Sequence, residues 1–304
     1  MLMNELLEQI YKDASSKIGQ GQVAQYIPAL ADVDPNQFGV AICDVKGNVY
    51  SIGDANIPFS IQSISKVYSL TLAMQRLGNK VWDRVGTEPS GLPFNSLVQL
   101  EHEQGVPRNP FINAGALVVA DMIESSFSTP SLAIKNFART LAANPDIQID
   151  ANVAASEYQH KARNAAMAYL MQSFGNFNNE VEQVLMSYFS SCALKMSCVD
   201  LAKSFSYLAN KGQCVFSQQR ILEEHQARQV NALMATSGLY DEAGKFAFEV
   251  GFPGKSGVGG GIVAIVPGVL SICVWSPALN QTGNSFVGIE ALKLLSSHID
   301  WSIY

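Results

Sequence analysis

The sequence lacks a surplus of basic residues. Its 304 residues include 20 Lys and Arg against 26 Asp and Glu, which gives a formal net charge of −6 at pH 7. Binding to a phosphate backbone relies on clustered cations, so this balance argues against a nucleic-acid partner. The sequence also has no basic run that would favour contact with a membrane surface. We therefore expect neither nucleic acid nor a membrane as a partner.

Long apolar stretches are missing as well. No uninterrupted run is long enough to cross a bilayer as a helix. Residues 1–11 form an acidic amphipathic pattern, without the basic start and apolar block of a secretion signal. This combination predicts a cytoplasmic protein.

Cysteine and histidine are both scarce. The five cysteines are scattered and odd in number, which predicts free thiols in a reducing compartment. The four histidines do not have the spacing of metal ligands, so we predict no metal site. The positions are Cys43, Cys192, Cys198, Cys214 and Cys273, and His102, His160, His225 and His298.

Apolar residues, in contrast, are abundant. Hydrophobic residues make up 48% of the chain and charged residues 15%, which is typical of a globular protein with a large core. Residues 38–44 and 49–53 flank a Gly-containing turn and predict a hairpin. Strand character returns near the other end. The three segments there are 246–250, 261–266 and 269–276.

Helical patterns fill the middle of the chain and its two ends. They cover about 2–18, 60–78, 113–123, 131–143, 150–157, 163–173, 178–190, 197–210, 220–238 and 284–298. We therefore expect an α/β (α+β) fold with one antiparallel five-stranded sheet, built from the N-terminal and C-terminal strands and flanked by helices. We expect residues 1–304 to form a single domain. Its α/β lobe would span about 1–62 and 239–304 and its helical lobe about 63–238, with a substrate cleft between them.

The first catalytic signal lies in the stretch from Phe59 to Leu70. Apolar residues recur there at helical spacing, and Ser60 is the expected N-cap. Ser63 and Lys66 are three positions apart, so their side chains share one face. A serine in the first turn feels the positive end of the helix dipole, and a desolvated lysine can act as a base. Taken alone, however, this spacing favours a polar residue near a cap and a surface lysine.

The second signal lies close to the C-terminal strands. Lys255-Ser256-Gly257 leads into the apolar segment 261–266. A Lys-[Ser/Thr]-Gly motif accompanies Ser-x-x-Lys in penicillin-type serine enzymes. The two motifs stand in that order here, with a long helical stretch between them. Together they predict a serine enzyme that transfers acyl groups.

These residues resemble the motifs of the serine-dependent glutaminases, which share the β-lactamase and penicillin-binding (transpeptidase-like) type of fold. The resemblance extends from about Tyr26 to Gly288. The motifs that carry it are Gln62-Ser63-Ile64-Ser65-Lys66, Glu88-Pro89-Ser90-Gly91, Asn109-Pro110-Phe111-Ile112-Asn113-Ala114-Gly115-Ala116, Ser237-Gly238-Leu239-Tyr240-Asp241 and Lys255-Ser256-Gly257-Val258-Gly259-Gly260-Gly261.

The resemblance implies hydrolysis of L-glutamine to L-glutamate and ammonia without a cofactor. Ser63 would attack the side-chain amide and form a glutamyl ester. Lys66 and Tyr240 would handle the protons, and either could be the general base. The N–H groups of Ser63 and Val258 would form the oxyanion hole, and Lys255 would support the charge balance.

The same resemblance implies residues for the amino-acid head group. Glu157 would hold the ammonium group of the substrate, because a buried charge needs a partner. Polar neighbours would be Asn113, Asn164 and Tyr188, with Tyr26 and Gln62 as further candidates. Each has a structural alternative when taken alone: Glu157 and Asn164 fit surface positions, Tyr188 fits a core aromatic, and Asn113 fits a helix N-cap.

Two other functions compete with the glutaminase interpretation. A penicillin-type serine hydrolase shares Ser-x-x-Lys and Lys-Ser-Gly, but the missing secretion signal and the presence of Glu157 argue against it. A non-catalytic glutamine-binding protein would not need Ser63, Lys66, Tyr240 and Lys255 together. The resemblance also implies a homodimer or homotetramer.

Overall fold

The two ends of the chain meet in one sheet, as predicted. The computed structural model describes residues 3–25, 27–91, 97–299 and 301–303. Its five-stranded antiparallel sheet has the order β2-β1-β8-β7-β6. The strands are β1 (Gly39–Asp44), β2 (Val49–Gly53), β6 (Gly254–Ser256), β7 (Gly261–Val266) and β8 (Leu270–Trp275). The pairing of Ile42 with Ile272 fixes the register of the N-terminal hairpin against β8.

The edge strand of this sheet was predicted at the wrong place. Residues 246–250 are not a strand: α12 (Ala243–Glu249) covers most of them, and β6 follows it. Apolar residues at 246, 248 and 250 alternate as in a strand, but positions 246 and 250 alone also have the spacing of one helix face. Phe246 and Val250 are buried, whereas Phe248 is 92% exposed. The buried residues, Phe246 and Val250, are therefore four positions apart, which is the spacing of one helix face.

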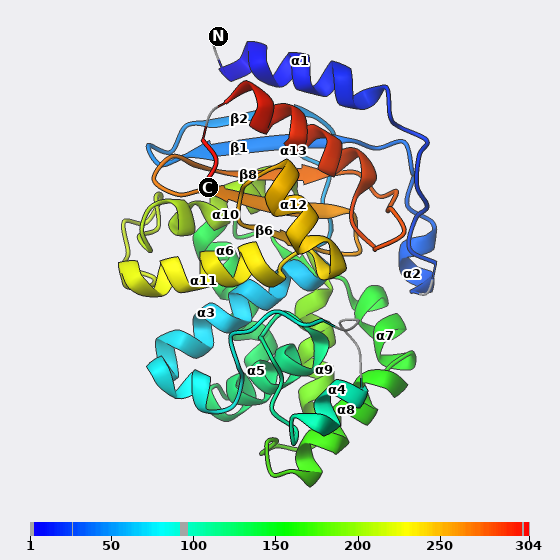
Figure 1. The fold of residues 1–304 in the computed structure, drawn as a ribbon, viewed down its shortest axis with the longest axis vertical. Coiled ribbons are helices and arrows are strands. Elements are labelled where there is room, and N and C mark those ends of the chain that lie inside the picture. The colour runs from blue at the N-terminus through cyan, green and yellow to red at the C-terminus, as the bar shows by residue number, and fades with distance from the viewer. Residues whose placement is uncertain (1–2, 26, 92–96, 300, 304) are drawn as a thin grey trace.

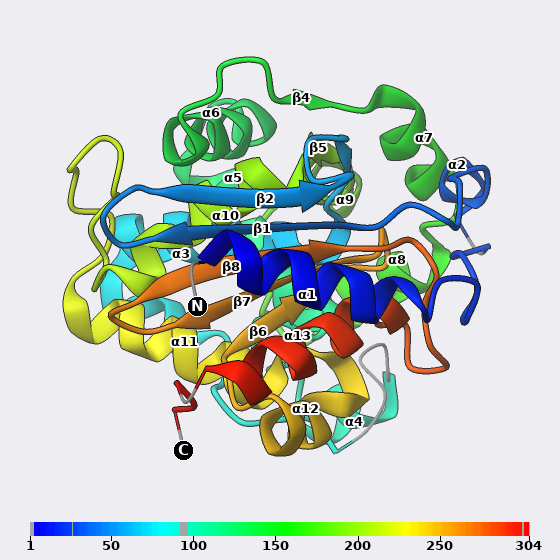
Figure 2. The ribbon, with the colours of Figure 1, turned by 90° about the horizontal axis from the view of Figure 1, so that it is seen from above.

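Helices cover both faces of the sheet (Figure 2). α1 (Met3–Ser15) and α13 (Phe286–His298) lie side by side over one face, and α10 (Cys198–Ala209) packs on the other. Side chains alternate along β7, so that Ile262 and Val263 belong to cores on opposite faces. Because both faces are covered, β7 and β8 are buried at every position.

A predominantly helical region lies on the α10 side of the sheet (Figure 1). The buried helix α3 (Ser65–Leu77) packs against α5, α6 and α9. The helices there are α4 (Leu97–His102), α5 (Asn113–Ser126), α6 (Pro130–Ala142), α7 (Ala151–Gln159), α8 (Ala162–Ser173), α9 (Val181–Cys192) and α11 (Glu224–Ser237). Shorter pieces are α2 (Pro28–Ala31) and three 3-10 turns, η1 (Gln62–Ile64), η2 (Gly78–Asp83) and η3 (Tyr240–Glu242).

Ser60 does not cap the serine helix. It belongs to β3 (Phe59–Ser60), which pairs with β5 (Leu194–Met196) in a small sheet that also contains β4 (Gln148–Ile149). The Ser60 hydroxyl donates to Cys192 O at 3.0 Å, whereas a capping hydroxyl would accept a backbone N–H of the helix. The chain then makes η1 before α3 begins at Ser65. The β-strand hydrogen bonds of Ser60 explain why the capping prediction was wrong.

All five cysteine side chains are buried free thiols. Within the described part of the chain, no helix combines the length and the apolar character needed to cross a membrane. The same residues contain no group of three or more His, Cys, Asp or Glu side chains that could hold a metal ion.

Candidate active site

One cavity of about 300 Å³ collects most of the predicted site residues. Its walls come from η1, α5, α7, α8, α9, η3 and the turn after β6. The predicted residues that line it are Gln62, Ser63, Asn113, Glu157, Asn164, Tyr188, Tyr240 and Val258. Lys66 and Lys255 lie behind this lining and are almost fully buried. Tyr26, a further predicted residue, lies outside the described residues.

The two hydroxyl groups of the site belong to one cavity. The Ser63 side chain interacts with the Tyr240 side chain. Burial raises the pKa of Tyr240 well above its ordinary value, and the contact with Ser63 offsets only part of that rise. The phenol therefore stays protonated near neutral pH. Tyr240 also has a φ of +51°, in the left-handed region that non-glycine residues rarely adopt. Such backbone strain is common where a functional side chain must be aimed.

Lys66 is buried in the first turn of α3, one helical turn after Ser63. Its Nζ donates to Asn113 Oδ1 at 2.7 Å and to Phe111 O at 3.1 Å. Burial lowers the pKa of Lys66 to about 8, although the negative charge of Glu157 opposes this change. A lysine with this pKa is partly neutral near physiological pH, which makes it a usable proton acceptor.

Lys255 supports Tyr240 from the sheet. Its Nζ donates to Ser256 O at 2.6 Å and to Gly238 O at 3.2 Å, and it lies 5.0 Å from the centroid of the Tyr240 ring. Burial, together with the nearby charge of Lys66, holds the pKa of Lys255 well below its ordinary value. Lys255 thus connects β6 to the segment that carries Tyr240.

The Glu157 side chain also lines the cavity, where its carboxylate accepts a hydrogen bond from Gln62. The Gln62 Nε2 group donates to Glu157 Oε1 and to Ser60 Oγ, each at 2.9 Å. Burial raises the pKa of Glu157 to about 7, against the effects of the Gln62 hydrogen bond and of Lys66. Like Tyr240, Gln62 has a left-handed φ, here +52°. Gln62 lines the cavity, but its amide nitrogen donates a hydrogen bond to Glu157.

Asn113 joins the catalytic and head-group sides of the cavity. Its Oδ1 accepts from Lys66, and its Nδ2 donates to Asn164 Oδ1 at 3.2 Å. The residue before α5 is Ile112, so Asn113 is inside the helix and not its N-cap. Tyr188 is buried, and burial raises the pKa of its phenol well above the ordinary value.

Several residues of the cavity wall were not predicted from the sequence. His160 and Arg163 lie on the chain between Glu157 and Asn164 and reach the same cavity. Their place between two predicted site residues was the only indication in the sequence, and it does not distinguish them from solvated surface residues. Ile27, Phe189 and Cys192 complete the lining. They come from elements whose contact with the cavity depends on tertiary packing.

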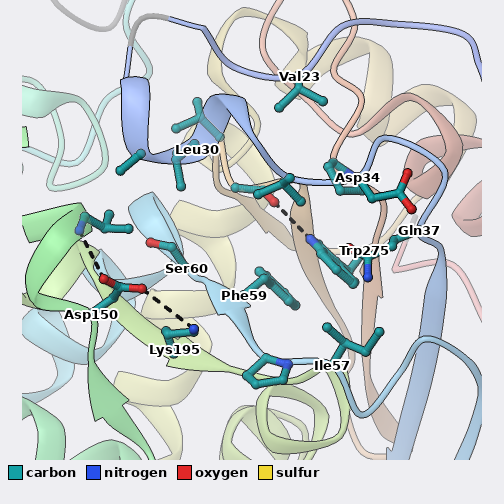
Figure 3. A pocket seen from close by; sticks show the side chains of 17 residues that line it. Val23, Leu30, Asp34, Gln37, Ile57, Phe59, Ser60, Asp150, Lys195 and Trp275 are labelled. Atoms are coloured by element: carbon teal, nitrogen blue, oxygen red, sulfur yellow. Dashed lines mark hydrogen bonds and ion pairs between the residues drawn. The ribbon is translucent and has the colours of Figure 1, made fainter. Parts of the chain in front are cut away.

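A second cavity, of about 370 Å³ (Figure 3), has Val258 in common with the first. Trp275 Nε1 donates to Gly259 O at 3.0 Å, and the Trp275 ring stacks on Phe59 with centroids 4.8 Å apart. Asp150, on the same wall, accepts the N–H of Val153 at the start of α7. These contacts fix the turn that carries Val258 and the helix that carries Glu157.

Comparison with known proteins agrees with this geometry. The family model described as Glutaminase matches residues 21–304. A protein named Glutaminase from Pseudomonas fluorescens (strain Pf0-1) is 60% identical over 302 residues, covering 99% of this chain and 100% of that protein. A second, from Pseudomonas entomophila (strain L48), is 61% identical and covers 99% of each chain.

Solved structures give the same result. One described as probable glutaminase ybaS has a TM-score of 0.93 and 34% identity, covering 99% of this chain and 97% of that one. A Bacillus glutaminase has a TM-score of 0.89 and 32% identity, with 99% of each chain covered. The predicted β-lactamase-like fold class is confirmed by the five-stranded antiparallel sheet and these neighbours. The chain belongs to the glutaminase family.

Proposed function

We propose that this protein hydrolyses L-glutamine to L-glutamate and ammonia through a glutamyl ester on Ser63. One observation carries the proposal: the paired Ser63 and Tyr240 hydroxyls share a cavity with the Glu157 carboxylate. Hydrolysis of the side-chain amide of a free amino acid needs a nucleophile, an acid–base group and a partner for the ammonium. Membership of the glutaminase family supports the choice of substrate.

In the first step, neutral Lys66 accepts the proton of Ser63 while Ser63 Oγ bonds to the amide carbon of the substrate. The lowered pKa of Lys66, about 8, favours this assignment, and the raised pKa of Tyr240 disfavours the phenol as base. Tyr240 instead donates its proton to the leaving nitrogen, so that ammonia departs. The proton on Lys66 then passes to the Tyr240 oxygen, which restores both groups.

In the second step, water attacks the ester and gives a proton to Lys66. The Ser63 oxygen leaves, takes that proton back, and L-glutamate is released. In both steps the carbonyl oxygen becomes negative, and the N–H groups of Ser63 and Val258 stabilise it. An oxyanion donor of this kind typically contributes about 3–4 kcal/mol in the transition state. The fixed turn from Gly257 to Gly261, closed by a 3.0 Å backbone hydrogen bond, supports the role of Val258.

Glu157 pairs with the substrate ammonium, while Asn113, Asn164 and Tyr188 bind the rest of the head group. We expect Glu157→Gln to raise KM for glutamine about 10- to 100-fold, or about 1.4–2.8 kcal/mol of lost binding, because a neutral amide cannot balance the ammonium charge. Steady-state kinetics measure the change. Glu182→Gln, which removes one carboxylate from an ion pair with Lys161, is the matched control. An unchanged KM in Glu157→Gln would remove Glu157 from head-group binding.

The pH profile provides a separate test. Glu157, with a pKa of about 7, must be ionised to bind the ammonium, and Lys66, with a pKa of about 8, must be neutral to act as base. Both requirements fail as the pH falls. We therefore expect kcat/KM to rise from about pH 6 to about pH 8.5, with a slope of log kcat/KM approaching about 2 at the acid end.

The Glu157→Gln variant removes one of these two titrations. Its profile should keep a slope of about 1, from Lys66 alone. A wild-type profile that is flat or falling between about pH 6.5 and about pH 8 would contradict the assigned protonation states.

The direct test of function is to measure glutamate and ammonia together, with glutamine as substrate. Equal release of both supports glutaminase activity. Turnover of a coloured β-lactam without ammonia release from glutamine would instead support a penicillin-type hydrolase.

We further infer one domain over residues 1–304, a reducing and cytoplasmic location supported by the buried free thiols, and a homodimer or homotetramer. Light scattering of the purified protein tests the last point.

A further inference from the structure

A polar network holds the turn that carries Tyr240. Glu242 Oε2 accepts hydrogen bonds from Thr282 Oγ1 at 2.5 Å, Asn280 Nδ2 at 2.7 Å and Asn284 Nδ2 at 2.7 Å. All three donors belong to the turn between β8 and α13, whereas Glu242 is the last residue of η3, which begins at Tyr240. One carboxylate oxygen therefore joins two segments that are about forty residues apart.

The network is half-buried and anchored on both sides. The Glu242 side chain is 14% exposed and Asn284 is fully buried. Asn284 Nδ2 also lies 3.3 Å from Leu239 O, the carbonyl that precedes Tyr240. Within the turn, Asn280 Oδ1 accepts the N–H groups of Thr282 and Asn284. These contacts leave η3 little freedom to move relative to the turn.

The charge of Glu242 is maintained by these donors. Burial alone would raise the pKa of Glu242, but hydrogen bonds from Thr282, Asn280 and Asn284 keep it below the ordinary value. Hydrogen bonds to an ionised acceptor are about twice as strong as those between neutral groups. Such a network suits a segment that must hold the left-handed backbone of Tyr240, at φ +51°.

The turn also touches the site from a second direction. A side-chain carbon placed at Gly283 would lie 3.9 Å from Tyr240 Cε2 and 3.9 Å from Val258 Cγ1. Gly283 itself has φ +89°, a conformation that favours glycine. The turn thus stands against both the proposed proton donor and the residue of the proposed oxyanion hole.

We propose that Glu242 is a positioning residue for the hydrolysis, and that it acts through Tyr240. Its carboxylate holds η3 so that the Tyr240 phenol stays within hydrogen-bond reach of Ser63. The inference rests on the proposed role of Tyr240 in catalysis. Because Glu242 lies outside the cavity lining, its loss should affect the chemical step and leave glutamine binding in place.

The test measures kcat and KM of the full-length enzyme. We expect Glu242→Ala to lower kcat about 10- to 100-fold with KM within about threefold, since misplacing a reacting group by about 1 Å has effects of this size. Glu242→Gln, which keeps an oxygen acceptor, should retain more activity than Glu242→Ala. Asp241→Asn is the matched control, because it removes an exposed carboxylate from the same turn, and we expect wild-type kcat.

A double-mutant cycle separates positioning from general stability. On a Tyr240→Phe background, Glu242→Ala should lower kcat by no more than about twofold, because the group through which it acts is already gone. Multiplicative losses in the double variant would overturn the inference. Should Glu242→Ala fail to fold, Thr282→Val removes one donor with little change in shape, and it should show the same kcat-specific loss on a smaller scale; wild-type kcat in that variant would overturn the inference as well.

The series also distinguishes this inference from the function on which it rests. If Tyr240→Phe is impaired and Glu242→Ala is not, positioning by Glu242 is wrong while the proposed mechanism stands. If Tyr240→Phe turns glutamine over at the wild-type rate, the role of the phenol is wrong, and the inference about Glu242 fails with it.

Discussion

Ser63→Ala is expected to lower glutamine turnover by about 10³-fold or more, because it removes the atom that bonds to the substrate. The Ser63 side chain lies in the candidate cavity and pairs with Tyr240. The change removes one oxygen from a half-buried position, so the fold should persist. Ammonia release at saturating glutamine measures the loss, and the melting temperature checks the fold.

Ser69→Ala is the control for this change. Ser69 lies on the same buried helix, α3, but outside the cavity lining, and its hydroxyl bonds back to Ser65 O at 3.4 Å. Its activity should match the wild type within about twofold, since a weak back-bond within a helix contributes little. Turnover by Ser63→Ala close to the wild-type rate would mean that another group is the nucleophile.

Tyr240→Phe is expected to lower kcat about 10²- to 10⁴-fold, the usual range for a positioned proton donor or acceptor. The substitution keeps the ring that lies 5.0 Å from Lys255 Nζ, measured to the centroid, and deletes only the hydroxyl that interacts with Ser63. KM should stay within about threefold, because the phenol acts on the leaving group and not on the head group.

The acylation and deacylation steps separate the roles of this tyrosine. Because the phenol protonates the amide nitrogen that leaves as ammonia, Tyr240→Phe should slow the first release of ammonia more than the later hydrolysis of the ester. Stopped-flow detection of ammonia gives the first rate. A kcat within about twofold of the wild type would contradict the assignment of Tyr240 as proton donor.

The positions of the strands could be predicted where burial on both faces makes the sequence almost continuously apolar. Apart from Ser271, strands β7 and β8 are apolar and are flanked by turn residues, so their positions could be predicted closely. The segment around Phe246 and Val250 was not, because its apolar residues alternate as in a strand while these two are also spaced as on one helix face. Local sequence cannot decide between these periods when a single exposed residue, Phe248, carries the difference.

The residues of the site were predictable through motifs, while their connections were not. Ser63 and Tyr240 stand in motifs that resemble those of glutaminases, and the same resemblance implied Glu157. The structure places all three on one cavity. The hydrogen bond from Gln62 to Glu157 joins positions 95 residues apart. A contact of that kind depends on tertiary packing, and no spacing rule for helices or strands contains it.

The network of Glu242 illustrates the same limit. Nothing near Glu242 in the sequence distinguishes it from the neighbouring Asp241, yet the first is half-buried and the second exposed. Only the fold brings the turn at Asn280 against η3. Backbone strain at Tyr240 is likewise invisible in the sequence, because the residue type gives no hint of a positive φ.

The central claim, a glutamyl ester on Ser63, is tested most directly by acid quenching during turnover of isotopically labelled glutamine, followed by peptide mass analysis. We expect a labelled glutamyl group on the peptide that contains Ser63, and we expect no such group in the Ser63→Ala protein. A labelled group on a different residue, or full turnover by Ser63→Ala, would contradict the mechanism.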